Sequence, residues 1–338
     1  MRLMIGLAAA GLALTCQAQA APWCPEGAVP DAVIQSLQRD ADKFAADRPR
    51  AVDHVHTEGT LPHQGIRDQS LEAEKDLPLM RDLALIWHKN HDKAILSRLT
   101  MLLDAWASVY QPDFDPIDET VFEPLIDAYA ITQTNLPMAT RQKVAVLLHK
   151  WSAGYIEKLQ GTNVSINNWS SHRVKLATMA AAALGDVGLF DAARAQFQYQ
   201  LGRNLHPDGQ SIDFEKRDAL YYQVYDLEPL VRSAMAARTR GEDWLNMKGA
   251  NGATVAAGLN WLMPYVRGEK THEEFVHSTV KFDLERKNAG VHGFGGVWDP
   301  KGAGELYWMA STLDVRYRPI AQALGNEPPW IAACWPPR

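Results

Sequence analysis

Apolar residues recur at spacings of three and four along most of this chain, and that pattern constrains its fold more than any other feature. Such spacing places apolar side chains on one face of an α-helix. Strand signals are weak, because no run of alternating β-branched residues exceeds about five. The sequence therefore predicts an all-α protein, with helices at Asp31–Ala46, Glu72–Lys89, Ala94–Tyr110, Glu119–Ile131, Arg141–Gln160, Trp169–Leu184, Leu189–Leu205, Asp218–Arg238, Thr254–Arg267 and Leu306–Ala323.

Consecutive helices joined by short turns either stack as a superhelix or close into a toroid. No internal sequence repeat is visible, which weighs against a regular solenoid, so we expect a helical toroid with a cleft at one rim. Two long segments, 47–71 and 268–304, lack regular periodicity. Loops of that length in a compact domain are usually functional or disordered, so we expect both to border the cleft. No shift in composition suggests a linker, and we expect residues 21–338 to form a single domain.

The N-terminus has the features of a secretory signal peptide. Arg2 precedes an apolar run from Met4 to Leu14, and Ala18-Gln19-Ala20 is a cleavage site of the A-x-A kind. We therefore expect residues 1–20 to be removed and the protein to be periplasmic or secreted. No other segment reaches the ~18 apolar residues that a membrane helix needs, so we expect no membrane partner.

Two cysteines remain after this leader, Cys24 and Cys334, one close to each end of the chain. Export to an oxidising compartment favours a disulfide between them. Such a bond would tie both termini down; the alternative is two free thiols.

The formal net charge is −6, with no basic block, which argues against a general nucleic-acid or polyanion surface. An enzyme for an acidic polymer would need its positive charge concentrated in the cleft. The chain also has 11 tryptophans. Tryptophan fills cores but also stacks on sugar rings, so this count is compatible with carbohydrate binding.

Two segments, NVSINNWSSH (163–172) and IDFEKRDALYYQVYDLEPL (212–230), combine groups suited to β-elimination from an acidic sugar polymer. That reaction removes the C5 proton beside the carboxylate and expels the oxygen at C4. Asn168 and Arg217 could hydrogen-bond and neutralise the carboxylate. His172 is a suitable base near neutral pH. Tyr225 could protonate the leaving oxygen, or do both jobs if nearby cations lower its pKa.

The surrounding side chains have a structural and a functional interpretation. Asn168 and His172 are four residues apart and share a helix face. Asn167 and Asn168 could instead simply cap the helix that follows. Arg217 could be a surface ion-pair partner of Asp213, and the tyrosines could form a core stripe. We expect substrate contacts from Asn167, Trp169, Arg173 and Tyr222, with Trp169 alternatively a core residue.

The segment from His54 to Arg67 is rich in histidine, glycine and proline. It could be a lid that contributes substrate contacts from His63 and Arg67, or a plain loop. A third possibility is a metal site made by His54, His56, Glu58 and His63. Their spacing matches no zinc signature, so we expect neither a metal nor another cofactor.

Four segments resemble the alginate lyase family of polysaccharide lyases: 115–129, 166–172, 217–230 and 305–309. The resemblance implies an incomplete (α/α) toroid. It also implies an Asn-Asn-His trio and a catalytic tyrosine that begins Tyr-x-Leu-x-Pro-Leu, with an arginine seven residues earlier. Asn168 matches the second asparagine of the trio, and Tyr225 matches the tyrosine.

Two positions depart from the family pattern. Trp169 occupies the histidine position, and the imidazole follows three residues later at His172. Asp218 lies seven residues before Tyr225, with Arg217 one residue earlier. The chain is therefore a divergent member, and a uronate polymer other than alginate stays open as its substrate.

Three functions remain after this comparison. The first is a polysaccharide lyase acting on an acidic polysaccharide as a monomer. The second is an inverting glycoside hydrolase, which needs two carboxyl groups ~6.5–9.5 Å apart and would draw them from Asp213, Glu215 and Asp218. The third is a non-catalytic periplasmic protein that binds glycans.

Overall fold

The structure, a computed structural model, describes residues 22–27 and 29–336. The predicted signal peptide, residues 1–20, lies outside the described residues. Within them the chain is helical, and its extended pairing is limited to two isolated bridges, Leu205 with Ser211 and Glu273 with Val297. The expectation of an all-α protein is confirmed.

Most helices follow one another with short connections; apart from the two long segments, residues 239–254 also form a longer connection. In chain order they are α1 (Asp31–Asp42), α2 (Arg67–Glu74), α3 (Asp76–Asn90), α4 (Lys93–Val109), η1 (Glu119–Phe122), α5 (Glu123–Thr132), α6 (Met138–Gln160), α7 (Asn168–Leu184), α8 (Val187–Asn204), α9 (Ile212–Arg217), α10 (Leu220–Arg238), α11 (Val255–Val266), α12 (Lys281–Asn288), η2 (Pro300–Ala303), α13 (Gly304–Leu313), η3 (Val315–Tyr317), α14 (Arg318–Leu324) and α15 (Pro329–Cys334).

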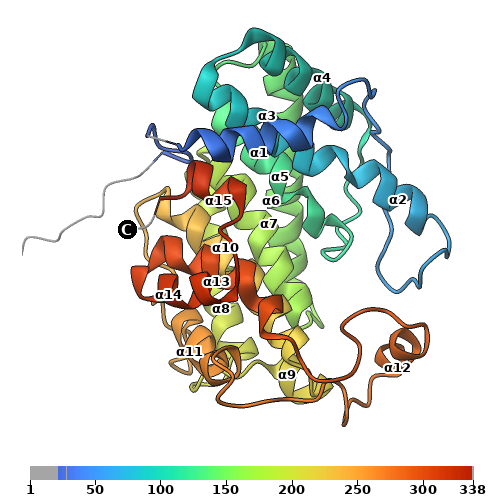
Figure 1. Ribbon diagram of the computed structural model, residues 1–338, viewed down its shortest axis with the longest axis vertical. Coiled ribbons are helices and arrows are strands. Elements are labelled where there is room, and N and C mark those ends of the chain that lie inside the picture. The colour runs from blue at the N-terminus through green and yellow to red at the C-terminus, as the bar shows by residue number, and fades with distance from the viewer. Residues whose placement is uncertain (1–21, 28, 337–338) are drawn as a thin grey trace, which may run out of the picture.

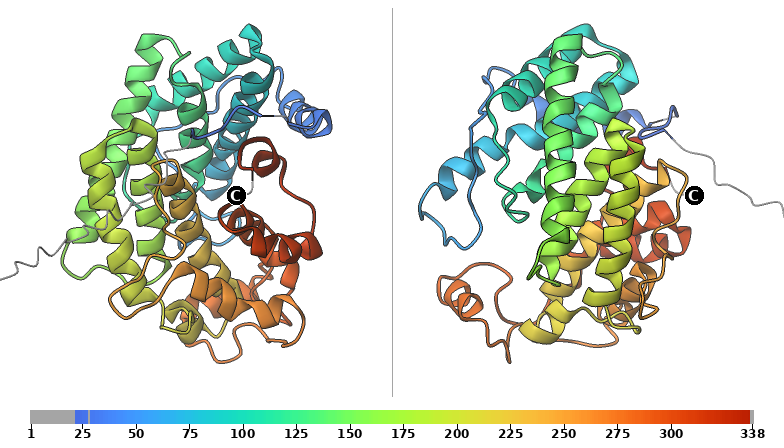
Figure 2. Two further views of the ribbon diagram at one scale, coloured as in Figure 1. Left: turned by 90° about the vertical axis from the view of Figure 1, so that its left-hand side faces the viewer. Right: turned by 180° about the vertical axis from the view of Figure 1, so that it is seen from behind.

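Helix α7 lies at the centre of the molecule and packs against α6, α8 and α10 (Figures 1 and 2). It is buried on nearly all sides, as expected for a helix whose faces all contact other helices. Its C-terminal residue is followed by Gly185 in the left-handed conformation, with φ 69°. Asp186 then caps α8 by accepting a hydrogen bond from the Leu189 amide. This turn makes α7 and α8 an antiparallel hairpin.

The two ends of the described chain meet at a disulfide between Cys24 and Cys334, whose Cα atoms are 4.7 Å apart across 310 positions of sequence. The rings of Trp23 and Trp335 pack edge to face beside it, 5.9 Å between centroids. The predicted pairing of the cysteines is confirmed.

We expect the double change Cys24→Ser and Cys334→Ser to lower the melting temperature by roughly 10 °C, because a cross-link over so long a loop removes entropy from the unfolded chain. Thermal unfolding followed by circular dichroism measures this, with the oxidised wild type as the control. An unchanged melting temperature would show that the bond contributes nothing to stability.

Some predicted helices differ in their bounds or are divided. The predicted helix at Asp218–Arg238 begins two residues later, at Leu220, because Asp218 has a left-handed backbone (φ 50°) that ends α9, a short helix that the periodicity did not predict. The predicted helix at Glu72–Lys89 spans the end of α2 and nearly all of α3. Helix α12 was not predicted, since its sequence KFDLERKN is short and mostly polar and shows no apolar stripe.

The two long segments project on the same side of the molecule (Figures 1 and 2). We call residues 47–74, which end in α2, the first arm, and residues 268–303, which include α12, the second arm. Among the helices of the described residues, none has the length and apolar character needed to cross a membrane.

Candidate active site

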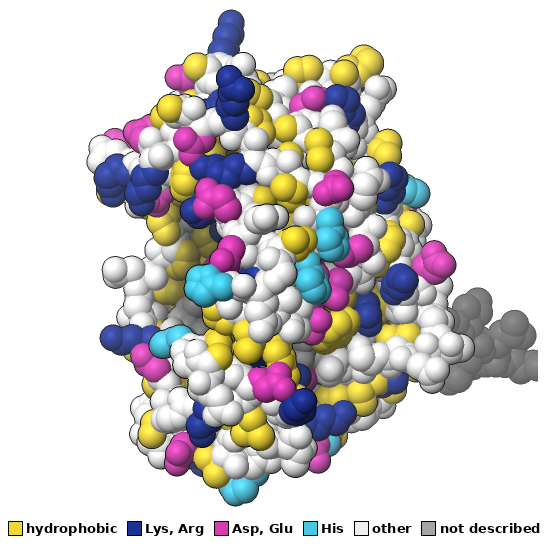
Figure 3. Space-filling view, turned by 90° about the vertical axis from the view of Figure 1, so that its right-hand side faces the viewer, with side chains coloured by type: hydrophobic (Ala, Val, Ile, Leu, Met, Phe, Trp, Pro, Cys, Tyr) yellow, Lys and Arg dark blue, Asp and Glu magenta, His cyan; other side chains and the backbone are white. Residues whose placement is uncertain are grey.

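Three cavities meet at the side chain of Tyr225, on the face from which the two arms project. Figure 3 shows this face, whose surface is hollowed. The arginine cavity, about 200 Å³, is lined by residues that include Arg67, Asn168, Trp169, Arg217, Tyr222, Tyr225 and Arg286. The histidine cavity, about 320 Å³, includes Thr120, Glu123, His172, Lys175, Tyr225 and Glu228. The tryptophan cavity, about 400 Å³, includes Tyr221, Tyr225, Glu228, His292 and Trp298.

The first arm is held against the body by Asp118, which precedes η1. Its carboxylate accepts hydrogen bonds from the amides of Thr57 and Glu58, 2.6 and 2.7 Å long. Glu58, Thr60, Pro62 and Arg67 of this arm line the arginine cavity, and Phe282, Arg286, Val291 and Phe294 of the second arm line it too. The expectation that both long segments border the cleft is therefore confirmed.

Asn168 is the first residue of α7, and a buried carboxylate fixes its position. The amide N and the side-chain Nδ2 of Asn168 donate to Asp213, at 2.7 and 2.8 Å. Both groups are almost fully buried. One N–H and the carbonyl oxygen of the Asn168 amide are left for other partners. Asp213 thus serves to orient Asn168, which lines the arginine cavity beside Tyr225.

Asn168 and His172 lie on the same helix, as predicted, but line adjacent cavities with Tyr225 between them. The rings of His172 and Tyr225 are 4.5 Å apart between centroids. Nδ1 of His172 is 2.7 Å from Oγ1 of Thr120, to which Lys175 Nζ also donates. Nε2 of His172 is buried and has no hydrogen-bond partner among the described residues.

Burial moves the pKa values of these two rings in opposite directions. It lowers the pKa of His172 well below 6.5, with the nearby Lys175 ammonium adding to the effect. It raises the pKa of Tyr225 well above 10, with Tyr221, Tyr222 and Glu228 adding to the effect and Arg286 opposing it. The idea that cations lower the pKa of Tyr225 is therefore wrong for the free protein. At neutral pH the imidazole is therefore uncharged and the phenol is protonated.

Arg217 does not pair with Asp213, contrary to the alternative interpretation of its sequence position. It forms an ion pair with Asp283, a buried residue of α12. Its guanidinium also lies 3.9 Å from the ring centroid of Tyr222. Arg217 lines the arginine cavity, but the carboxylate of Asp283 in the second arm balances its charge.

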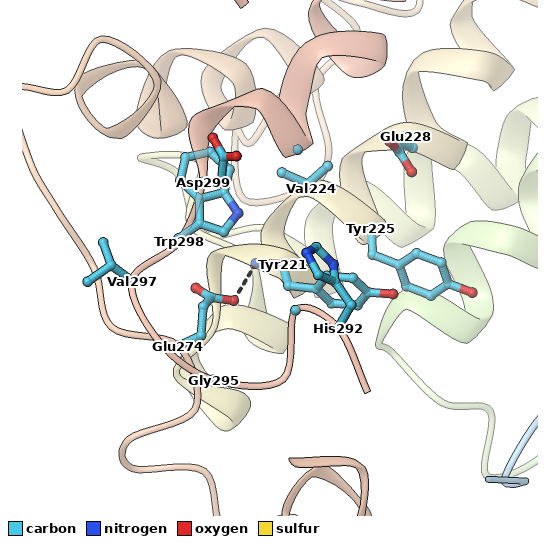
Figure 4. A pocket seen from close by; sticks show the side chains of 12 residues that line it. Tyr221, Val224, Tyr225, Glu228, Glu274, His292, Gly295, Val297, Trp298 and Asp299 are labelled. Atoms are coloured by element: carbon cyan, nitrogen blue, oxygen red, sulfur yellow. Dashed lines mark hydrogen bonds between the residues drawn. The ribbon is translucent and has the colours of Figure 1, made fainter. Parts of the chain in front are cut away.

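The tryptophan cavity continues the surface on the far side of Tyr225. Figure 4 shows the rings of Tyr221 and Tyr225 side by side, with His292 next to them and Trp298 to their left, beside Asp299. The two tyrosine rings are nearly parallel, 6.0 Å between centroids. Burial, with Glu305 and Glu123 nearby, raises the pKa of Glu228 to about 8, so this carboxyl group is protonated at neutral pH.

Three predicted contact residues are not brought into the cavities. The Asn167 side chain caps α7 by accepting from the Trp169 amide. Arg173 donates to Ser165 Oγ and lies over the Trp169 ring. The His63 side chain is 84% exposed and pairs with Asp68. Trp169, Arg67 and Tyr222, by contrast, line the arginine cavity.

The alternative sites receive less support from the geometry. The Asp213 carboxylate accepts hydrogen bonds from Asn168. Glu215 is paired with His206 at the surface. Asp218 is paired with His277. None of these three carboxylates lines the cavities that meet at Tyr225. For a metal, the described part of the chain holds no group of three or more His, Cys, Asp or Glu side chains that could bind an ion.

Sequence reasoning missed several cavity residues, chiefly Arg286, Lys175, Glu228 and Trp298. Lys175 and Glu228 lie three residues after His172 and Tyr225, on the same helix faces. This spacing could have identified them. Nothing local marks Arg286 or Trp298 beyond their position in the long second segment.

The chain is similar to known proteins in both sequence and structure. A family model described as alginate lyase matches residues 25–272. A solved alginate lyase from Bacteroides ovatus has a TM-score of 0.62 at 18% identity, covering 90% of this chain and 92% of that one. A histidine-to-alanine variant of alginate lyase A1-III, complexed with a tetrasaccharide, has a TM-score of 0.62 at 17% identity, covering 91% and 94%.

Alginate lyase A1-III from Sphingomonas species A1 has a TM-score of 0.54 at 18% identity, covering 71% of this chain and 77% of that one. A search of curated proteins found no match. At these identities the structural likeness establishes the fold, which is the expected (α/α) toroid.

Proposed function

We propose that this chain, which belongs to the alginate lyase family and is a polysaccharide lyase, cleaves a uronic-acid polymer by β-elimination at Tyr225. Family membership favours alginate, in particular polymannuronate, and related polyuronates such as polyglucuronate as the substrate. The observation that carries the proposal is the position of the Tyr225 phenol. It lies between a cavity lined by amide and guanidinium groups and a cavity that holds an uncharged imidazole.

Stabilisation of the substrate carboxylate is the first requirement of the reaction. The C5 proton is weakly acidic while the neighbouring carboxylate is charged, so hydrogen bonds and positive charge there favour its removal. The remaining N–H of Asn168 can donate to this carboxylate. Arg217 adds positive charge to the same cavity, although Asp283 holds its guanidinium.

Transfer of the proton is the second requirement. When Nδ1–H of His172 donates to Thr120, Nε2 keeps its lone pair and can remove the C5 proton. Tyr225, protonated at neutral pH, then donates its proton to the departing C4 oxygen. The rings are adjacent, so the proton gained by the imidazole can return to the phenolate and restore both groups. No cofactor is required for these steps.

Export is part of the same proposal. The predicted leader would carry the enzyme to the periplasm or outside the cell, where acidic polysaccharides are met. The disulfide between Cys24 and Cys334 supports such a compartment, because disulfides persist in oxidising environments.

Ultraviolet absorbance tests the proposed reaction. Elimination leaves a conjugated double bond between C4 and C5, so we expect a rise in absorbance when the purified protein meets polymannuronate, polyguluronate, polyglucuronate, polygalacturonate or hyaluronan. The polymer that gives the rise identifies the substrate. New reducing ends without absorbance would indicate hydrolysis instead, and binding without either product would indicate a glycan-binding protein.

A further inference from the structure

The second arm brings a cation to the arginine cavity from outside the region that matches the family model. That match ends at residue 272, whereas Arg286 belongs to α12, Lys281–Asn288. Arg286 lines the cavity together with Asn168, Trp169 and Tyr225. Arg286 therefore lies outside the residues that match the family model.

Aromatic rings and a phenol hold the Arg286 side chain in place. Its Nη1 donates to the Tyr222 hydroxyl at 3.0 Å. Its guanidinium carbon lies 4.2 Å from the ring centroid of Phe282 and 4.9 Å from that of Phe294. Aromatic contacts of this kind orient a guanidinium and exclude water around it, which strengthens its attraction for an anion.

Arg286 has no acidic partner within ion-pair distance among the described residues, which it shares with Arg67 but not with Arg217. Arg217 is paired with Asp283. Arg67 donates to the Thr57 carbonyl and Thr60 hydroxyl of its own arm, and so fastens that arm. A guanidinium that is oriented, half-buried and without a carboxylate is suited to bind one from a ligand.

The acidic group that faces Arg286 in the cavity is Glu58 of the first arm. The two make no ion pair within contact distance, although the positive charge of Arg286 acts on Glu58. Burial, reinforced by Asp115 and Asp118, raises the pKa of Glu58 above its usual value. Because the two groups are not in contact, Glu58 leaves Arg286 without a direct ion pair.

We propose that Arg286 binds the carboxylate of the sugar held in the arginine cavity and so makes the second arm a determinant of specificity for acidic sugars. This inference rests on the proposed lyase function, because it takes the ligand to be a uronate. Asn168 would donate to the same carboxylate, from the body of the toroid. The site would then be complete only with α12 docked.

The test compares Arg286→Gln with Lys281→Gln, which removes the same charge from a 91% exposed position of the same helix. Activity is measured on the polymer that raises absorbance. Binding is measured by calorimetry with mannuronate and glucuronate tetrasaccharides and with their carboxyl-reduced counterparts. We expect Arg286→Gln to raise KM, and Kd for the uronate that binds wild type, by at least about tenfold. Lys281→Gln should match wild type.

The carboxyl-reduced sugars separate recognition of charge from general damage to the site. Their binding should be the same in wild type and Arg286→Gln if the arginine acts on the carboxylate. An unchanged KM, or an equal loss of affinity for the reduced sugars, would overturn the inference. If the wild type instead releases no unsaturated product from any polymer, the lyase proposal fails, and calorimetry still shows whether Arg286 recognises a uronate.

Discussion

Replacement of Tyr225 by phenylalanine is expected to lower turnover by about 10²–10⁴-fold while leaving substrate binding largely intact. The change removes one hydroxyl from the residue at which the three cavities meet. Without it the departing C4 oxygen has no proton donor in place. The pKa of Tyr225 is raised well above 10 by burial, so the wild-type phenol stays protonated, and the rate should show no decline near neutral pH from its ionisation.

The matched control is Tyr221→Phe, since the Tyr221 ring lies parallel to that of Tyr225, one helical turn earlier. It loses the same atom from the same face of α10. We expect a much smaller loss of rate from it. Initial rates followed by absorbance, with tetrasaccharide affinity measured separately, distinguish the two variants. Normal turnover by Tyr225→Phe would remove this residue from the mechanism and bring Tyr221 or Tyr222 forward.

Replacement of His172 by alanine has the second largest expected effect, a loss of at least about 100-fold in kcat. Its Nε2 is buried beside Tyr225 without a hydrogen-bond partner in the described structure. A neutral nitrogen in this position can accept a proton from the substrate. A loss below about tenfold would reduce its role to positioning. His149→Ala is a suitable control, because this histidine lies in α6 and does not line the three cavities.

The pH dependence of the wild type provides an independent check on His172. An imidazole acts as a base only above its pKa, and the pKa of His172 is lowered well below 6.5, first by burial and then by Lys175. We therefore expect the rate to stay level as the pH falls through 6.5, and to decline only at more acidic values. A decline centred at the ordinary histidine pKa would show that His172 is exposed to solvent during turnover.

Much of the fold could be predicted because helices depend on residues close together in the chain. The apolar spacing in 169–184 and 189–205 predicts α7 and α8 to within a few residues, and Gly185 with Asp186 marks the turn between them. The periodicity missed the short helix α9 and placed the start of α10 at Asp218, two residues too early, since one backbone angle at Asp218 decides where the two helices are separated. It also missed α12, which has no apolar stripe of its own.

The candidate site was predictable only in part. Asn168, His172 and Tyr225 emerge from spacing and family resemblance, and the structure gathers them around one point. Their partners come from elsewhere in the chain: Asp213 orients Asn168, and Thr120 contacts His172.

The helices and the types of reactive group therefore follow from local sequence, because hydrogen bonds within a helix and apolar stripes join residues a few positions apart. The fold of the whole chain is needed to pair Asp283 with Arg217 and to bring Arg286 into the cavity without an acidic partner in the described chain. The path of the second arm brings these charges together across more than sixty positions, and no local pattern encodes that path.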